Sequence, residues 1–149
     1  MGSNLIDGLM LTSLRQIHDE RGAVFHFLKS ESVNFRHFGE SYFSKINEGV
    51  VKGWKLHFRA FQNMCVPVGR IKFVVYDVRR DSQTFGMINE IILDDSVNYH
   101  LLSLPSNIWY SFRAIDCDFA LLANISSELH DINECIQLPL ENDVIEYRW

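Results

Sequence analysis

Residues 53–69 read Gly-Trp-Lys-Leu-His-Phe-Arg-Ala-Phe-Gln-Asn-Met-Cys-Val-Pro-Val-Gly, with one glycine at each end of two strand-like stretches. Side chains alternate between the two faces of a β-strand, so Lys55 and His57 are expected on one face. The next stretch, 70–78, alternates as well, because every second residue is apolar (Ile71, Phe73 and Val75). One face of that strand can therefore pack against a core, while the other face is mixed.

Short segments of this kind, rich in β-branched and aromatic residues, recur along the whole chain and indicate an all-β protein. The predicted strands span 23–28, 41–46, 50–57, 63–68, 70–78, 85–93, 99–104, 109–114 and 119–125. Their spacing, with polar turns between them, is typical of a sandwich or barrel. We predict a single domain over residues 1–149, closed into a small barrel with a polar pocket in its mouth. Asp131 followed by Glu134 has the spacing of a capping box, which predicts a brief helix over 132–137.

Composition excludes several classes of protein. The 149 residues carry a net charge of −5, which argues against a nucleic-acid partner, since phosphates require a concentrated basic surface. No stretch approaches the roughly 20 apolar residues of a membrane span, so no membrane partner is expected. Three cysteines without CxxC spacing suggest neither a disulfide framework nor a zinc site, and favour reduced thiols in the cytoplasm.

The order Gly53, Lys55, His57, Gln62 and Gly69 resembles the first sequence motif of the cupin barrels. In that motif a glycine opens the strand, an H-x-H pair points inward, a glutamate follows, and a glycine closes the hairpin. The resemblance implies a cupin-type double-stranded β-helix, or jelly-roll barrel, with Lys55 and His57 projecting into its interior.

The second cupin motif, a P-x-G turn followed by histidine, is echoed by residues 105–107 and then Tyr110. A metal-binding cupin needs His, His, Glu and His at the four ligand positions, whereas this chain has Lys55, His57, Gln62 and Tyr110. A protonated lysine has no lone pair for a metal, and an amide is a poor replacement for a carboxylate. We therefore predict no tightly held metal and no other cofactor.

From about Val50 onward the chain resembles the dTDP-4-dehydrorhamnose 3,5-epimerase family. The matching residues are 49–53, 69–79, 81–86, 104–105, Trp109, Phe112, 138–139 and 147–149, and residues 19–22 resemble the family's early D-x-R-G. The resemblance implies a metal-independent enzyme, usually a homodimer, that acts on a nucleotide-diphospho-sugar. Family members invert carbons 3 and 5 of a 4-keto-6-deoxy hexose in the biosynthesis of surface polysaccharides or antibiotics.

The family's functional residues carry over only with substitutions. Its basic histidine, enolate-stabilising lysine, further histidine, acid tyrosine and orienting carboxylate fall on or near Lys55, Gln62, Tyr110, His130 and Glu141, in that order. His57 comes two residues after the position of the basic histidine and on the same face. The diphosphate-binding positions fall on Arg21 and Lys52, and a guanidinium suits such oxygen ligands. Arg59 flanks the expected pocket and can add positive potential.

These substitutions leave two interpretations open. In the first, Lys55, His57, Tyr110 and His130 run an epimerisation or isomerisation of a dTDP- or GDP-linked 4-keto sugar with exchanged roles, since a desolvated lysine beside another cation can act as a base. In the second, the loss of the usual base, acid and lysine leaves a noncatalytic barrel that binds a sugar nucleotide. A purely structural barrel with an occluded pocket is a third, weaker alternative. In a homodimer, the N-terminal strand region can carry Arg21 into the partner's pocket.

Overall fold

The computed structural model describes residues 4–149, which form twelve β-strands. The strands are β1 (Met10–Ser13), β2 (Gln16–Asp19), β3 (Gly22–Phe25), β4 (Glu40–Asn47), β5 (Val51–His57), β6 (Gln62–Val68), β7 (Arg70–Asp77), β8 (Ile88–Asp94), β9 (His100–Leu104), β10 (Ile108–Ala114), β11 (Phe119–Ser126) and β12 (Cys135–Gln137). Nine of them correspond to the predicted strands. The short strands β1, β2 and β12 were not predicted.

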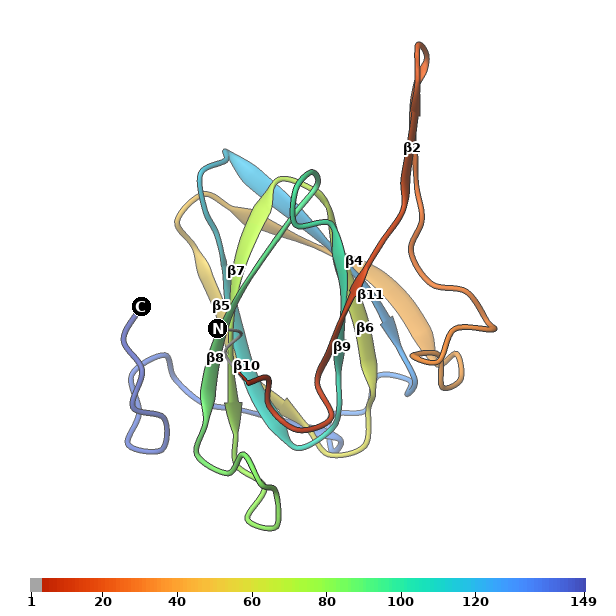
Figure 1. The fold of residues 1–149 in the computed structure, drawn as a ribbon. Coiled ribbons are helices and arrows are strands. Elements are labelled where there is room, and N and C mark those ends of the chain that lie inside the picture. Colours follow the sequence, from red (N-terminus) through yellow and green to blue (C-terminus); the bar gives the residue numbers. More distant parts are fainter. Residues whose placement is uncertain (1–3) are drawn as a thin grey trace.

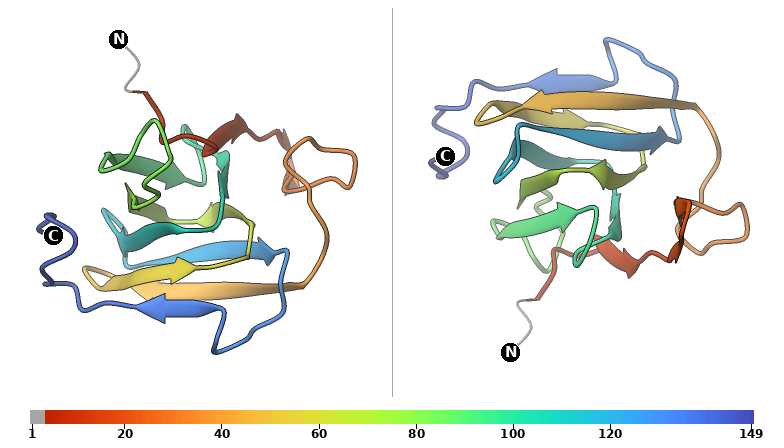
Figure 2. Two further views of the ribbon diagram at one scale, coloured as in Figure 1. Left: turned by 90° about the horizontal axis from the view of Figure 1, so that it is seen from below. Right: turned by 90° about the horizontal axis from the view of Figure 1, so that it is seen from above.

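Ten of these strands form two five-stranded antiparallel sheets that face each other (Figures 1 and 2). One sheet has the order β1-β9-β6-β11-β4, and the other has the order β12-β5-β10-β7-β8. Strands distant in sequence pair directly, such as β1 with β9 and β12 with β5. The predicted all-β jelly-roll barrel is confirmed.

Strand β7 shows why both faces of one sheet are buried. Ile71, Phe73 and Val75 point into the barrel core, as the alternation predicts. Val74, on the opposite face, is also fully buried, because it packs in a second apolar cluster with Trp54 and residues of the C-terminal segment 138–149. The last residues of the chain therefore cover the outside of the sheet that carries β5.

The predicted helix over 132–137 is wrong. Residues 132–134 form a turn, and β12 then pairs with β5. Asp131 accepts a hydrogen bond from the backbone N–H of Asn133, as a turn residue does. Glu134 makes its hydrogen bonds to His57 and to the backbone N–H groups of Arg59 and Ala60, so it does not complete a capping box.

Strands β2 and β3 form a separate hairpin that projects from the barrel (Figure 1). Arg21 lies at its tip, where it forms an ion pair with Asp19 at 2.6 Å and is 84% exposed. Ile17 and Val24 are exposed on its strands. Such apolar residues on a projecting hairpin leave surface that another molecule can cover.

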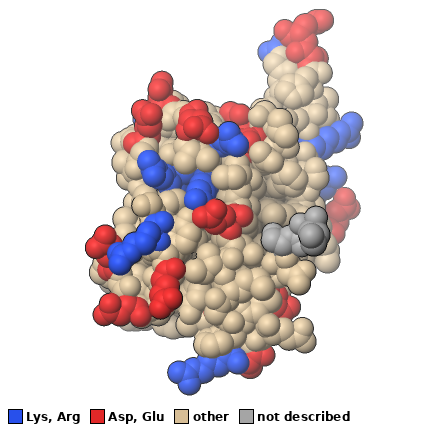
Figure 3. Space-filling model, turned by 60° about the vertical axis from the view of Figure 1, so that its left-hand side comes forward, with Lys and Arg blue, Asp and Glu red and all other residues tan. Residues whose placement is uncertain are grey.

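Charged side chains of both signs are interspersed on the face of the molecule shown in Figure 3. Within residues 4–149, no helix is long and apolar enough to cross a membrane.

Candidate active site

A cavity lies between the two sheets and consists of two hollows of about 240 and 220 Å³. The two hollows share Tyr42 and Lys55 as lining residues. The larger one is also lined by Ser44, Lys52, Gly53, Met64, Tyr110, Phe112, Leu122, Asn124 and Gln137, and the other by Glu40, His57, Ser126, Glu128, Leu129, His130, Asp131, Glu134 and Cys135. Polar and titratable groups thus meet in two adjoining, partly open hollows, which is where chemistry on a small molecule is expected.

Strand β5 carries Lys55 and His57 on its cavity face, as the alternation predicts. Trp54 and Leu56 point the other way and are buried under the C-terminal segment. Gly53 allows β5 to approach β10, because a Cβ at this position would lie 2.6 Å from the Cβ of Ser111. Its φ of +122° also disfavours any other residue. Gly53 therefore lets β5 lie close to β10, and this fixes the position of the strand that carries Lys55 and His57.

His57 is held by a buried carboxylate that sequence analysis did not identify. Its Nδ1 lies 2.6 Å from Oε2 of Glu134, whose side chain is only 3% exposed. The other oxygen of Glu134 accepts hydrogen bonds from the backbone N–H groups of Arg59 and Ala60. Glu134 is thus fixed by the backbone that follows β5 and is aimed at the imidazole.

Glu141 does not contact His57. Its side chain is 86% exposed and lies 3.6 Å from the guanidinium of Arg148. The carboxylate that contacts His57 in the structure is Glu134, which stands seven residues before Glu141. Its spacing from Asp131 suggested a helix cap, and no local pattern distinguishes a cap from a carboxylate that points into a barrel.

The environment favours a neutral imidazole beside an ionised carboxylate. Burial lowers the pKa of His57, and Glu134 offsets only part of that effect. Burial acts to raise the pKa of Glu134, but the hydrogen bonds from His57, Ala60 and Arg59 outweigh it and lower that pKa. Since a carboxylate can only accept, Nδ1 of His57 carries the proton, and Nε2 is the nitrogen that can accept a hydrogen bond or a proton.

A chain of hydrogen bonds runs from His57 across to the other sheet. Nε2 of His57 lies 3.2 Å from the hydroxyl of Tyr110, which in turn lies 3.5 Å from Oε1 of Gln62. The amide nitrogen of Asn124 donates to that same Gln62 oxygen and to the hydroxyl oxygen of Tyr42, both at 2.8 Å. Burial raises the pKa of Tyr110 far above its usual range, so this phenol remains protonated.

Two lysines bring positive charge to the cavity. Lys52 reaches from β5 to β4, where its ammonium donates to the hydroxyl of Ser44 and the carbonyl of Lys45. Lys55 makes no hydrogen bond or ion pair with any residue of the described chain, and it lines both hollows. Its charge is therefore available to a negatively charged ligand.

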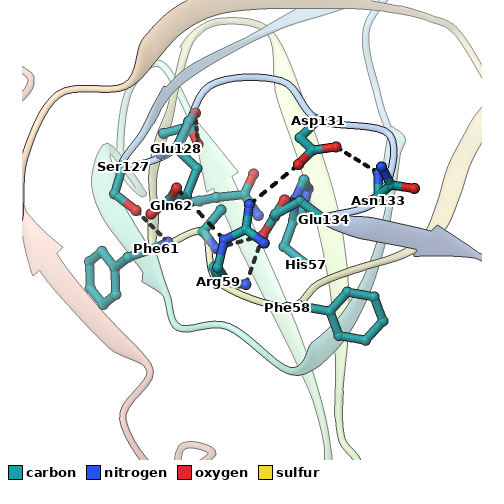
Figure 4. A network of polar contacts seen from close by, with 12 residues as sticks. His57, Phe58, Arg59, Phe61, Gln62, Ser127, Glu128, Asp131, Asn133 and Glu134 are labelled. Carbon is teal, nitrogen blue, oxygen red and sulfur yellow. Dashed lines mark hydrogen bonds and ion pairs between the residues drawn. The ribbon is translucent and has the colours of Figure 1, made fainter.

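Arg59 lies next to the smaller hollow, beside the lining residues Glu128 and Asp131 (Figure 4). Arg59 forms ion pairs with Asp131 at 3.5 Å and Glu128 at 3.9 Å, and its side chain is half exposed. His130 is exposed and lines the same hollow. Arg21 lines neither hollow of its own chain, because it lies at the tip of the projecting hairpin.

A metal centre finds no support in the donor set. Among residues 4–149, no three His, Cys, Asp or Glu side chains are grouped in a way that could hold an ion. Lys55 lines both hollows, and its ammonium would repel a cation there.

Comparisons with known proteins give a consistent family. Residues 3–149 match the family model described as dTDP-4-dehydrorhamnose 3,5-epimerase. Over 118 residues the chain is 30% identical to the probable low-salt glycan biosynthesis epimerase Agl13 of Haloferax volcanii, which covers 78% of this chain and 75% of that protein. Over 111 residues it is 28% identical to the spore coat polysaccharide biosynthesis protein SpsL of Bacillus subtilis, covering 74% and 73%.

Among solved structures, the chain is similar to a dTDP sugar isomerase from Desulfovibrio desulfuricans G20. The TM-score is 0.94 and the identity 39%, over 97% of this chain and 92% of the other.

Proposed function

Since this chain belongs to the dTDP-4-dehydrorhamnose 3,5-epimerase family, it is an epimerase or isomerase, and we propose that its substrate is a dTDP-linked 4-keto-6-deoxy hexose. The proposed reaction removes a proton from carbon 3 or 5, beside the ketone, and returns one. The observation that carries the proposal is the buried His57–Glu134 pair that faces a cavity beside the unpaired ammonium of Lys55.

In the proposed mechanism His57 is the base. A C–H proton beside a ketone is weakly acidic, so the base must be neutral and close to the reacting carbon. Nε2 of His57 is the unprotonated nitrogen because Nδ1 donates to Glu134, and the substrate C–H would replace the Tyr110 hydroxyl that lies 3.2 Å from it. When Nε2 takes the proton, the imidazolium is stabilised by the Glu134 carboxylate, as in other histidine–carboxylate pairs.

Lys55 is the proposed enolate stabiliser. Removal of the proton leaves negative charge on the carbon 4 oxygen, which a nearby cation stabilises in the transition state. The family's lysine for this role corresponds to Gln62, whose oxygen is already occupied by Asn124. Lys55 is two residues from His57 on the same face, so its ammonium supplies the charge that Gln62 lacks.

Substrate binding is proposed for Lys52 and Arg59, with Lys52 towards the diphosphate, whereas the predicted Gln62 is 1% exposed and lines neither hollow. We also propose a homodimer in which the β2–β3 hairpin of one protomer reaches the partner and carries Arg21 to the phosphates. The exposed Ile17 and Val24 on that hairpin supply apolar surface for such a contact. Sedimentation velocity tests this assembly: a dimer is expected, and a monomer at micromolar concentration contradicts it.

Incubation of the protein with dTDP-4-keto-6-deoxyglucose in deuterated water, followed by NMR, tests the reaction. We expect deuterium at carbon 3, carbon 5 or both, and the GDP-linked sugar serves as the comparison for the nucleotide. A protein that binds the substrate in calorimetry but incorporates no deuterium from either sugar would contradict the proposal. That outcome would favour a barrel that only binds a sugar nucleotide.

A further inference from the structure

The proposed reaction inverts a carbon, so it needs a proton donor on the side of the sugar opposite to His57. His57 and Lys55 belong to β5, in the sheet of order β12-β5-β10-β7-β8. The opposite wall is formed by β4 and β11 of the other sheet. A donor that completes the inversion is therefore expected on β4 or β11.

Tyr42, which is 39% exposed, is the titratable side chain of β4 that stands between the two hollows. It lines both of them, as Lys55 does from the other wall. Glu40 and Ser44 stand two residues away on either side and line one hollow each, so this face of β4 points into the cavity. The bond from Lys52 to Ser44 shows directly that β5 and β4 face each other across this space.

The hydrogen bonding of Tyr42 leaves its proton free. Its hydroxyl oxygen accepts a hydrogen bond from the amide of Asn124 at 2.8 Å. Within residues 4–149 no group accepts the proton of this hydroxyl, so the O–H is available to a ligand in the cavity. Asn124 is itself buried and is held by Gln62, which fixes the position of the Tyr42 oxygen.

The electrostatics suit an acid that is protonated before the reaction. Burial raises the pKa of Tyr42, and the hydrogen bond from Asn124 acts in the opposite direction. The phenol is therefore protonated at neutral pH, and the phenolate formed after proton transfer keeps one donor.

We propose that Tyr42 is the catalytic acid of this enzyme, an inference that rests on the proposed function. After His57 has removed the C–H proton, the enolate electron pair forms a new C–H bond with the proton of Tyr42, while its O–H bond breaks and the ketone is restored. The phenolate regains a proton from water, and the imidazolium releases its proton to water. No other reactant is needed.

The two acid candidates from the sequence are less well placed. Tyr110 belongs to β10, which pairs with β5, so it lies on the same wall as His57. Its hydroxyl is also within reach of both His57 and Gln62. His130 is exposed at the rim of the smaller hollow and lines only that one.

Tyr42→Phe tests the inference, because it removes the hydroxyl and keeps the ring. In deuterated water we expect the variant to form epimer at least about a hundredfold more slowly, the usual contribution of a general acid. Deuterium should still enter the substrate with retained configuration, at a rate within about tenfold of wild type. This occurs because His57 still removes the proton and returns a solvent deuteron to the same face.

Tyr76→Phe is the matched control, since Tyr76 packs outside the cavity against the C-terminal segment. It should leave both rates unchanged, and calorimetry with dTDP should show similar affinity for both variants. Tyr42→Phe with wild-type epimerisation would overturn the inference, and so would an equal loss of exchange and epimerisation with dTDP binding intact. Absence of exchange in the wild-type protein would instead refute the proposed function.

Discussion

Two buried carboxylates, Asp77 at the end of β7 and Glu134 before β12, are both kept ionised by hydrogen bonds, but their partners differ. Both side chains are nearly inaccessible, and hydrogen bonds outweigh burial and lower the pKa of each. Asp77 is surrounded by the guanidinium of Arg79 and the hydroxyls of Ser82 and Thr84. Glu134 receives two backbone N–H groups and one imidazole.

The two carboxylates differ in whether their hydrogen-bond partners reach the cavity. All hydrogen-bond partners of the Asp77 carboxylate belong to the turn over residues 77–84, so its charge holds that turn. The imidazole that contacts Glu134 has a second nitrogen, which faces the cavity. A lowered pKa alone therefore does not mark a functional carboxylate. A lowered pKa together with a hydrogen bond to a side chain that lines a cavity does.

The largest effect is expected where the imidazole between Glu134 and the cavity is removed. His57→Asn keeps a donor for Glu134 but has no basic nitrogen, so epimerisation should fall about a thousandfold. Solvent exchange into the substrate, followed by NMR, should fall equally, since both start with the same proton removal. Exchange at the wild-type rate would show that another group is the base.

Asp77→Asn should affect stability and not chemistry. It leaves the charge of Arg79 without its partner and should lower the free energy of unfolding by about 3 kcal/mol, or the melting temperature by about 10 °C. The folded variant should keep its kcat. Asp81→Asn, an exposed residue of the same turn, is the control and should change the free energy of unfolding by less than about 0.5 kcal/mol. A loss of kcat without a loss of stability would contradict this division of roles.

Glu134→Gln should show the reverse pattern, with kcat lowered about a hundredfold, because the imidazolium loses its stabilising charge. The carboxylate raises the pKa of His57, so its removal should also shift the acidic limb of the pH–rate profile to lower pH. Glu141→Gln, at the exposed position, is the control and should leave both quantities unchanged. A larger effect at Glu141 than at Glu134 would reject the assignment.

The smallest expected effect is on the pH dependence of stability. The folded pKa of Asp77 is lower than its unfolded value of about 3.9, so its stabilisation is present above that pH and is lost as the pH falls towards the folded pKa. Urea unfolding between about pH 5 and pH 2.5 should therefore show a flatter curve for Asp77→Asn than for the wild-type protein. Parallel curves would mean that the turn does not depend on the charge.

The sequence allowed the barrel and part of its site to be predicted. Alternation in β7 identified the core face, and alternation in β5 identified Lys55 and His57 as neighbours in the cavity. These predictions succeeded because the period of a strand is a local property. The strands β1 and β12 were missed, since they are only four and three residues long and exist through pairing with β9 and β5.

The order of residues along a strand already shows which side chains share a face, because pleating depends only on neighbours along the chain. Which carboxylate meets His57, and which amide holds the Tyr42 hydroxyl, depends on the tertiary structure. Glu134 is 77 residues from His57 along the chain, and Tyr42 takes its hydrogen bond from Asn124, 82 residues away. The pairing of strands within each sheet brings these residues together, and no local sequence pattern indicates contacts between residues so far apart along the chain.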